Sequence, residues 1–311
     1  MKENFKLFCT LTRAYSLPIS VMSWLVPFLF ALFNKGNVLY GIIALFGIVV
    51  LHLASNLFDD IIDYSRELWD IKRGKKIDFN FQKGKCCCII ENKITFKKAI
   101  LINIILFGIA FLTGLFFLGI SGIKLLYILI PSIVLCLLYP VLGCMGLGEI
   151  IIAIIFSPLL YSGVYLVMTG GFSLQILILS ISTGFLTVAI LFNHSLLDFK
   201  YDTTNRKITL CRICRNEKNA LILLTVIIAL AYVNLLFWVL QGSLNVLYLL
   251  PCLTLPFALK LIKEMNVYIS KDKTPDNAQN FLEKFLMAQN LQKYFIIVLC
   301  VSIILSDWFK L

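Results

Sequence analysis

The chain has 311 residues, of which 60% are hydrophobic and only 14% are charged. A soluble domain of this length needs far less apolar side chain, so the composition excludes a water-soluble globular protein and indicates a membrane protein. The formal net charge of +11 raises the question of nucleic acid, but the basic residues fall in short segments between long apolar runs. That pattern favours membrane topology and argues against a nucleic-acid partner.

Nine apolar segments of the chain are long enough, or nearly so, to cross a bilayer as helices. Prolines inside several of them predict kinks, which membrane helices tolerate. We therefore predict an all-α integral membrane protein with nine transmembrane helices, folded as one membrane-embedded domain over residues 1–311. In chain order the segments are Leu17–Phe33, Val38–Phe58, Ala99–Leu118, Leu125–Leu142, Ile150–Met168, Leu174–Phe192, Ala220–Leu240, Val246–Ile262 and Tyr294–Phe309.

Positive charge predicts the orientation of these helices. With the N-terminus in the cytoplasm, all but three of the 28 Lys and Arg residues fall in cytoplasmic segments. The exceptions, Lys35, Lys124 and Lys310, lie in outer turns or at the C-terminus. We expect a multi-pass protein with a cytoplasmic N-terminus, an outside C-terminus and no cleavable signal peptide.

The ten cysteines are scattered along the chain, several of them inside apolar segments, which argues for reduced thiols and against a disulfide framework. Clustered cysteines can bind a metal or take part in redox chemistry, and this chain has two such groups, Cys86 to Cys88 and the pair Cys211 and Cys214. A lone C-x-x-C lacks the other two ligands of a zinc site, so we expect neither group to carry chemistry.

The end of the second apolar segment collects acids, in the run NLFDDIIDYSRE. If the helix continues at about 100° per residue, Asn56, Asp60, Asp63 and Glu67 form one stripe, and Asp59 lies beside it. Like charges this close repel one another unless a cation lies among them. Hard divalent cations prefer oxygen ligands and often bridge to phosphates, so the stripe predicts a Mg²⁺ site. An isolated D-D-x-x-D is about equally well explained as a solvated helix end.

A second acidic stripe closes the sixth segment, in the run FNHSLLDFKYD. His194, Asp198 and Asp202 are spaced at i, i+4 and i+8, and by the predicted topology both stripes end at the cytoplasmic face. Carboxylates that hold a metal, with cations nearby, suit a substrate that carries a diphosphate. The nearby cations are Lys72, Arg73, Lys75 and Lys76 after the first stripe, and Arg206 and Lys207 after the second.

These paired motifs resemble the UbiA superfamily of intramembrane aromatic prenyltransferases. The family carries N-D-x-x-D-x-x-x-D at the end of helix 2, where this chain has Asp59-Asp60-x-x-Asp63-x-x-x-Glu67. It carries D-x-x-x-D at the end of helix 6, where this chain has Asp198-x-x-x-Asp202, followed by RKITL in place of G-K-x-T-L. Asp59 and Glu67 depart from the family's usual Asn and Asp, and His194 stands where one branch tends to have Asn.

The resemblance implies a helical bundle with a cavity open to the cytoplasmic side. It implies Mg²⁺-dependent transfer of a polyprenyl group from polyprenyl diphosphate to an aromatic acceptor, with the lipid bilayer as surroundings. Asp60, Asp63, Asp198 and Asp202 would be catalytic and, with Glu67, would bind the metal. The residues expected to bind substrate are Arg13, Asn56, Asp59, Glu67, Lys72, Arg73, Glu149, His194, Arg206 and Lys207.

Four further sequence runs resemble one branch of the family. The runs LTRAYSLPISVMSWLVPFLFAL, NLFDDIID, GLGE and SPLLYSGVYLVMTG resemble 1,4-dihydroxy-2-naphthoate polyprenyltransferases. In these matches Arg13 takes the place of the branch's arginine, and Glu149 ends the GLGE run. This resemblance implies a step of menaquinone synthesis in a bacterial inner (plasma) membrane.

Several alternatives stay open. The acceptor could be 4-hydroxybenzoate or another aromatic compound, and the chain could be an inactive descendant, which metal-dependent turnover would exclude. A transporter with acidic gates would place its acids near the midplane, whereas these lie at helix ends. A CDP-alcohol phosphotransferase would carry D-G-x-x-A-R, which is absent here. A soluble prenyl-chain synthase shares D-D-x-x-D but needs no membrane spans.

Overall fold

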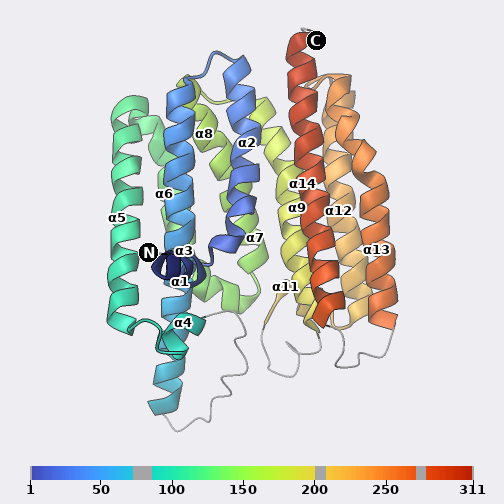
Figure 1. The fold of residues 1–311 in the computed structure, drawn as a ribbon. Coiled ribbons are helices and arrows are strands. Elements are labelled where there is room, and N and C mark those ends of the chain that lie inside the picture. The colour runs from blue at the N-terminus through green and yellow to red at the C-terminus, as the bar shows by residue number, and fades with distance from the viewer. Residues whose placement is uncertain (1, 73–85, 200–207, 271–277, 310–311) are drawn as a thin grey trace.

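A computed structural model describes residues 2–72, 86–199, 208–270 and 278–309 of the chain (Figure 1). Within these ranges every regular element is helical, which confirms the all-α prediction. The long helices are α2 (Leu17–Phe33), α3 (Val38–Lys72), α5 (Phe96–Ser121), α6 (Leu126–Leu142), α9 (Leu174–Leu197), α12 (Glu217–Leu240), α13 (Leu255–Ser270) and α14 (Ala278–Trp308).

One apolar stretch is built from three consecutive pieces: α7 (Gly148–Ile154), the π-helical turn η5 (Ile155–Leu159) and α8 (Leu160–Thr169). The π turn contains Pro158, which lacks a backbone N–H and so explains the predicted kink. The shorter elements are α1 (Lys2–Leu11), η1 (Ala14–Ser16), α4 (Cys87–Ile90), η3 (Gly122–Leu125), η4 (Gly143–Met145), α11 (Leu210–Ile213) and η6 (Val246–Thr254).

By length and hydropathy, the described residues contain 8 stretches that could cross a membrane. One of them, Phe96–Leu142, has 47 residues, or about 70 Å of helix, more than twice the thickness of the hydrocarbon core. It turns at Gly122, whose φ of +66° suits a residue without a Cβ, and α5 and α6 then run side by side (Figure 1). The prediction of nine transmembrane helices divides this stretch into two at the turn. The total of nine transmembrane helices stays a prediction.

The outer surface of the bundle is apolar, as a bilayer requires. Phe111 and Leu112 on α5 and Ile222 on α12 are each more than half exposed. In water such a surface would drive aggregation, whereas lipid tails solvate it at no cost. Together with the apolar stretches, this surface makes the chain an integral, multi-pass membrane protein.

Two of the four clusters of buried side chains hold most of the long helices together. The larger joins α9, α12 and α14 through residues such as Phe192, Leu224 and Phe295. The other joins α2, α3, α5 and α8 through residues such as Trp24, Ala44 and Phe117. Helix α2 contributes to both clusters, because Val26 and Phe30 face the first while Trp24 and Ala31 face the second.

Several helices extend beyond the apolar segments predicted from the sequence. The ninth segment was predicted to begin at Tyr294, but α14 begins at Ala278. Its first part is polar enough to escape a hydropathy pattern, yet it buries Lys284 and Gln292 against the bundle. Helix α3 continues unbroken beyond Phe58 to Lys72, as the acidic stripe assumed.

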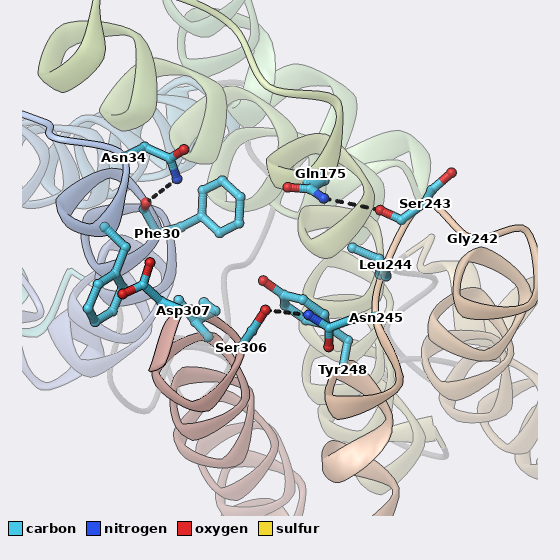
Figure 2. A pocket seen from close by; sticks show the side chains of 12 residues that line it. Phe30, Asn34, Gln175, Gly242, Ser243, Leu244, Asn245, Tyr248, Ser306 and Asp307 are labelled. Carbon is cyan, nitrogen blue, oxygen red and sulfur yellow. Dashed lines mark hydrogen bonds between the residues drawn. The ribbon is translucent and has the colours of Figure 1, made fainter. Parts of the chain in front are cut away.

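The two ends of the bundle differ in chemistry. The C-terminal ends of α3 and α9, which carry the acidic stripes, both lie at the lower end of Figure 1. At the opposite end, a cavity of about 470 Å³ lies between α2, α9, η6 and α14 (Figure 2). The acidic end is the candidate active site.

Candidate active site

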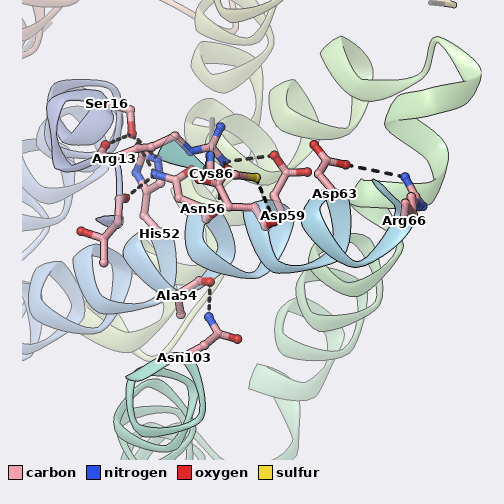
Figure 3. Close-up of polar contacts among 12 residues, drawn as sticks. Arg13, Ser16, His52, Ala54, Asn56, Asp59, Asp63, Arg66, Cys86 and Asn103 are labelled. Atoms are coloured by element: carbon pink, nitrogen blue, oxygen red, sulfur yellow. Dashed lines mark hydrogen bonds and ion pairs between the residues drawn. The ribbon is translucent and has the colours of Figure 1, made fainter. Parts of the chain in front are cut away.

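Arg13 lies at the centre of the polar contacts around α3 (Figure 3). One guanidinium nitrogen, Nη2, donates to Asp59 Oδ2 and to the carbonyl oxygen of Asn56, each at 3.0 Å, and lies 3.6 Å from Asp60 Oδ1. Burial alone would lower the pKa of Arg13, but the carboxylates of Asp60 and Asp59 outweigh this effect and raise it. Arg13 is therefore a permanent cation that neutralises the start of the acidic stripe.

The connection between α1 and α2 is fastened to α3 by further hydrogen bonds. Asn56 Nδ2 donates to the carbonyl oxygen of Thr12 at 3.2 Å and to Ser16 Oγ at 3.0 Å. One turn earlier, His52 hydrogen-bonds Ser16 and Ser20 through its two ring nitrogens. These contacts hold Arg13 in a left-handed conformation, with φ of 51°, which an arginine rarely adopts.

Asp60 is held from the other side by the segment that precedes α4. The backbone N–H of Cys86 donates to Asp60 Oδ2 at 3.0 Å, and its thiol donates to the Asp60 carbonyl oxygen at 3.1 Å. Cys86 is 2% exposed, and its φ of 52° is again left-handed. The neighbouring Cys88 and Ile89 pack against Leu57 and Ile61 of α3, which anchors this segment.

Asp63 is the more open carboxylate of the first stripe. Its side chain is 20% exposed, whereas those of Asp59 and Asp60 are each 5% exposed. Arg66 Nη1 lies 3.8 Å from Asp63 Oδ1 and donates to the carbonyl oxygen of Pro140 at 2.9 Å, which ties α3 to the end of α6. The last predicted residues on α3, Glu67 and Lys72, lie within the helix, but the structure does not describe their side chains.

The second stripe begins with a pair on α9. His194 Nδ1 lies 3.4 Å from Asp198 Oδ2, and the two side chains are 44% and 30% exposed. The ring of His194 meets Phe281 and Phe285 of α14 edge to face, which fixes its orientation. The other predicted site residues, Arg73, Asp202, Arg206 and Lys207, lie outside the described residues.

Glu149 joins the second stripe through a hydrogen bond. It lies in the first turn of α7, is 7% exposed, and accepts a hydrogen bond from Ser195 Oγ at 3.1 Å. Ser195 follows His194 on α9, so the GLGE run is held directly against that helix.

The side chains at the acidic ends of α3 and α9 offer carboxylate oxygens, which are the ligands that hard divalent cations prefer. Within the described ranges, no three His, Cys, Asp or Glu side chains come together as a metal site. Asp59 and Asp60 share Arg13 as an ion-pair partner, and its single positive charge balances one of the two carboxylates. Within the two stripes, Asp63 and Asp198 have more exposed side chains than Asp59 and Asp60, and Asp202 would extend the set.

Sequence patterns missed three contributors to this site: Arg66, Cys86 and the backbone carbonyl of Asn56. Arg66 lies on the acidic helix, where its i,i+3 spacing from Asp63 was a usable signal. Cys86 acts through its backbone and its conformation, for which the sequence carries no pattern.

The chain is a membrane-embedded helical bundle with carboxylates at the ends of two of its helices and an arginine paired with the first of these groups. The model of the UbiA prenyltransferase family matches residues 19–288, and the chain belongs to this family. The protein is accordingly a prenyltransferase, and the expected UbiA-like fold is confirmed.

Solved structures with this fold cover nearly the whole chain. Digeranylgeranylglyceryl phosphate synthase matches with a TM-score of 0.67 at 16% identity, over 97% of this chain and 99% of that chain. A UbiA homologue from Archaeoglobus fulgidus, bound to GPP and Mg²⁺, matches with a TM-score of 0.62 at 14% identity, over 94% and 99%. A UbiA homologue from Aeropyrum pernix K1 matches with a TM-score of 0.62 at 15% identity, over 93% and 98%. These identities establish the fold alone, and no curated protein sequence matches significantly.

Proposed function

We propose that the protein transfers a polyprenyl group from its diphosphate to 1,4-dihydroxy-2-naphthoate, with Mg²⁺ as cofactor. The observation that carries the proposal is the pair of acidic helix ends at one end of the bundle, one of them built around buried Arg13. The Archaeoglobus fulgidus homologue was solved with GPP, with DMAPP and with Mg²⁺, which supports a prenyl diphosphate donor here.

The metal would be held by Asp60, Asp63, Asp198 and Asp202, with Glu67 on the first helix, and would neutralise charge on the diphosphate. Arg13 keeps the carboxylates of Asp59 and Asp60 in fixed positions. Arg66 and the four lysines and two arginines that follow the stripes would supply further positive charge for phosphate oxygens. The apolar bundle beneath would take the hydrocarbon tail.

In the transfer, the allylic C–O bond of the donor breaks and its electron pair leaves with the diphosphate. The electron-rich ring of the acceptor then forms the new C–C bond at the allylic carbon. With the naphthoate acceptor, the ring carbon loses its carboxylate as carbon dioxide. A dry cavity that holds both substrates supplies proximity and protects the allylic cation from water.

Two contacts support the naphthoate branch. Arg13 and Glu149 come from runs that resemble that branch, and both form side-chain hydrogen bonds at the acidic end. The alternative acceptor is 4-hydroxybenzoate. A pocket for two fused rings leaves apolar wall uncovered when one ring binds, at about 25 cal/mol per Å².

A competition assay tests the acceptor. Purified protein receives one polyprenyl diphosphate and equal concentrations of both acceptors, and mass spectrometry separates the products. We expect prenylated naphthoquinol to exceed prenylated hydroxybenzoate by about 5- to 150-fold, since such pockets discriminate by about 1–3 kcal/mol. Dominance of the hydroxybenzoate product would replace the naphthoate assignment. Release of diphosphate without either product would place the acceptor outside both classes.

The proposed setting is a bacterial inner membrane, with the N-terminus and the active site on the cytoplasmic side and the C-terminus outside. Reporter fusions after Lys35 and Lys124 and at the C-terminus should report outside. Fusions near Lys76 and Arg215 should report inside, and an inside C-terminus would overturn the count of nine spans.

A further inference from the structure

The cavity at the opposite end of the bundle carries an isolated acid. By the predicted topology, Asp307 is the only one of the 17 Asp and Glu residues at the outer end of the molecule. It lies near the end of α14 and lines the cavity of about 470 Å³. That volume falls within the range of small-ligand sites.

Hydrogen bonds fix the orientation of the amide side chains around the cavity (Figure 2). Asn34 Nδ2 donates to the carbonyl oxygen of Phe30 at 2.8 Å, and Gln175 Nε2 donates to the carbonyl oxygen of Ser243 at 3.1 Å. Because each partner is a carbonyl oxygen, the amide nitrogen must face it and the amide oxygen turns away. Figure 2 shows the oxygen of Gln175 directed across the cavity toward Phe30.

A second layer of contacts closes the wall beside α14. Asn245 Nδ2 donates to Ser306 Oγ, and Asn245 Oδ1 accepts from the backbone N–H of Leu247 at 2.9 Å. Both the nitrogen and the oxygen of the Asn245 amide therefore already form hydrogen bonds within the protein. The acceptors that line the cavity include the carboxylate of Asp307, the amide oxygens of Asn34 and Gln175, and the hydroxyl oxygens of Ser243, Tyr248 and Ser306.

Both the charge and the aromatic side chains of the cavity favour a cationic ligand. Among the described residues that line it, Asp307 is the only charged one; Lys35 is the next residue after Asn34 but does not line it. The rings of Phe30, Phe33 and Tyr248 form part of the wall. Aromatic faces attract cations, and a carboxylate with neutral acceptors suits a ligand rich in donors.

We propose that this cavity binds a primary ammonium group, carried either by an ethanolamine phospholipid or by a free amine. An –NH₃⁺ group has three N–H donors and no acceptor, which matches the carboxylate of Asp307 and the amide oxygens of Asn34 and Gln175. A quaternary ammonium keeps the charge but lacks the donors and binds more weakly. The site is separate from the acidic ends of α3 and α9, so the inference does not depend on the identity of the prenyl acceptor.

Native mass spectrometry of the full-length protein tests the site. The protein is released from micelles that contain equal amounts of phosphatidylethanolamine, phosphatidylcholine and phosphatidylglycerol, and the retained lipids are counted. We expect phosphatidylethanolamine to be retained preferentially. The variant Asp307→Asn should retain it about tenfold less, because it loses a charge-assisted hydrogen bond, while Asp307→Glu should keep most of the retention.

Two controls and one further arm complete the experiment. Lys35→Gln removes a charge at the same end without touching the cavity wall and should not lower retention. Free ethanolamine, added without phosphatidylethanolamine, separates the two sources of the ammonium group. Saturable binding of ethanolamine that Asp307→Asn weakens supports a free amine, and retention of the lipid alone supports the phospholipid. Equal retention of all three lipids, or an Asp307→Asn protein that retains phosphatidylethanolamine as wild type does, overturns the proposal.

Discussion

The two acidic helix ends are alike in sequence but differ in how they are built. At the end of α3, Asp59 and Asp60 are almost fully buried and are held by Arg13 and Cys86. At the end of α9, Asp198 is 30% exposed, and its described partner is His194 at 3.4 Å. The first end is a preassembled scaffold, whereas the second has carboxylate oxygens still available to a ligand. Mutations at the two ends should therefore separate stability from catalysis.

The largest effect should follow from removing the arginine. Arg13→Met leaves two buried carboxylates without their cation, which costs about 3–5 kcal/mol when one partner of a buried pair is lost. We expect a clear fall in thermal stability in detergent together with loss of prenyl transfer. Arg66→Met is the matched control, because Arg66 is 41% exposed and its loss should change stability little. Wild-type stability of Arg13→Met would show that the scaffold does not depend on this cation.

The next largest effect is expected on turnover, and it distinguishes the two acidic helix ends. Asp198→Asn should lower turnover by at least 100-fold while leaving the melting temperature unchanged, because it removes a ligand from the open end. Asp60→Asn should lower both turnover and melting temperature, since Asp60 is also part of the buried scaffold. Chelation of Mg²⁺ should stop wild-type turnover without unfolding the protein, because Arg13 still neutralises the α3 end. Full activity of Asp198→Asn would refute a mechanism that needs both ends.

A smaller effect is expected at the segment that holds Asp60. Cys86→Ala removes the thiol donor to the Asp60 carbonyl oxygen but keeps the backbone N–H donor, so we expect a loss of about 1 kcal/mol. Cys86→Gly loses the same hydrogen bond but relieves the left-handed backbone, so it should be less harmful than the alanine variant. Thermal melts of the two variants check the order, and the reverse order would contradict the role assigned to the backbone conformation.

The smallest effect is a pH dependence at the same segment. Burial, together with the neighbouring Cys87, raises the pKa of the Cys88 thiol to about 11. The thiol therefore stays protonated at pH 7, and the thiolate fraction rises about tenfold per pH unit until the pH approaches that pKa. Alkylation of Cys88 by iodoacetamide, followed by peptide mass spectrometry, should accelerate accordingly between pH 7 and 9. A rate that levels off near pH 8.5, the pKa of a free thiol, would show that α4 does not shield Cys88.

Periodicity and charge predicted the helical class, the course of α3 through its acids and the placement of both acidic helix ends at the same end of the bundle. They did so because each property belongs to a continuous stretch of chain. The start of α14 was missed because Lys284 and Gln292 are buried polar residues, which hydropathy counts as solvent-facing. The contact between Cys86 and Asp60 was missed because it joins segments 26 residues apart through the backbone.

The position of Arg13 also bears on how the protein is made. Helices α2 and α3 form a hairpin, and the polar contacts of Arg13 with Asn56 and Asp59 join its two ends across more than 40 residues. Insertion of the hairpin into a bilayer returns both ends to the same surface, so the membrane itself performs the loop closure that would otherwise cost entropy. Because the N-terminal residues emerge first during synthesis, half of the charged site can assemble before the later helices have left the ribosome.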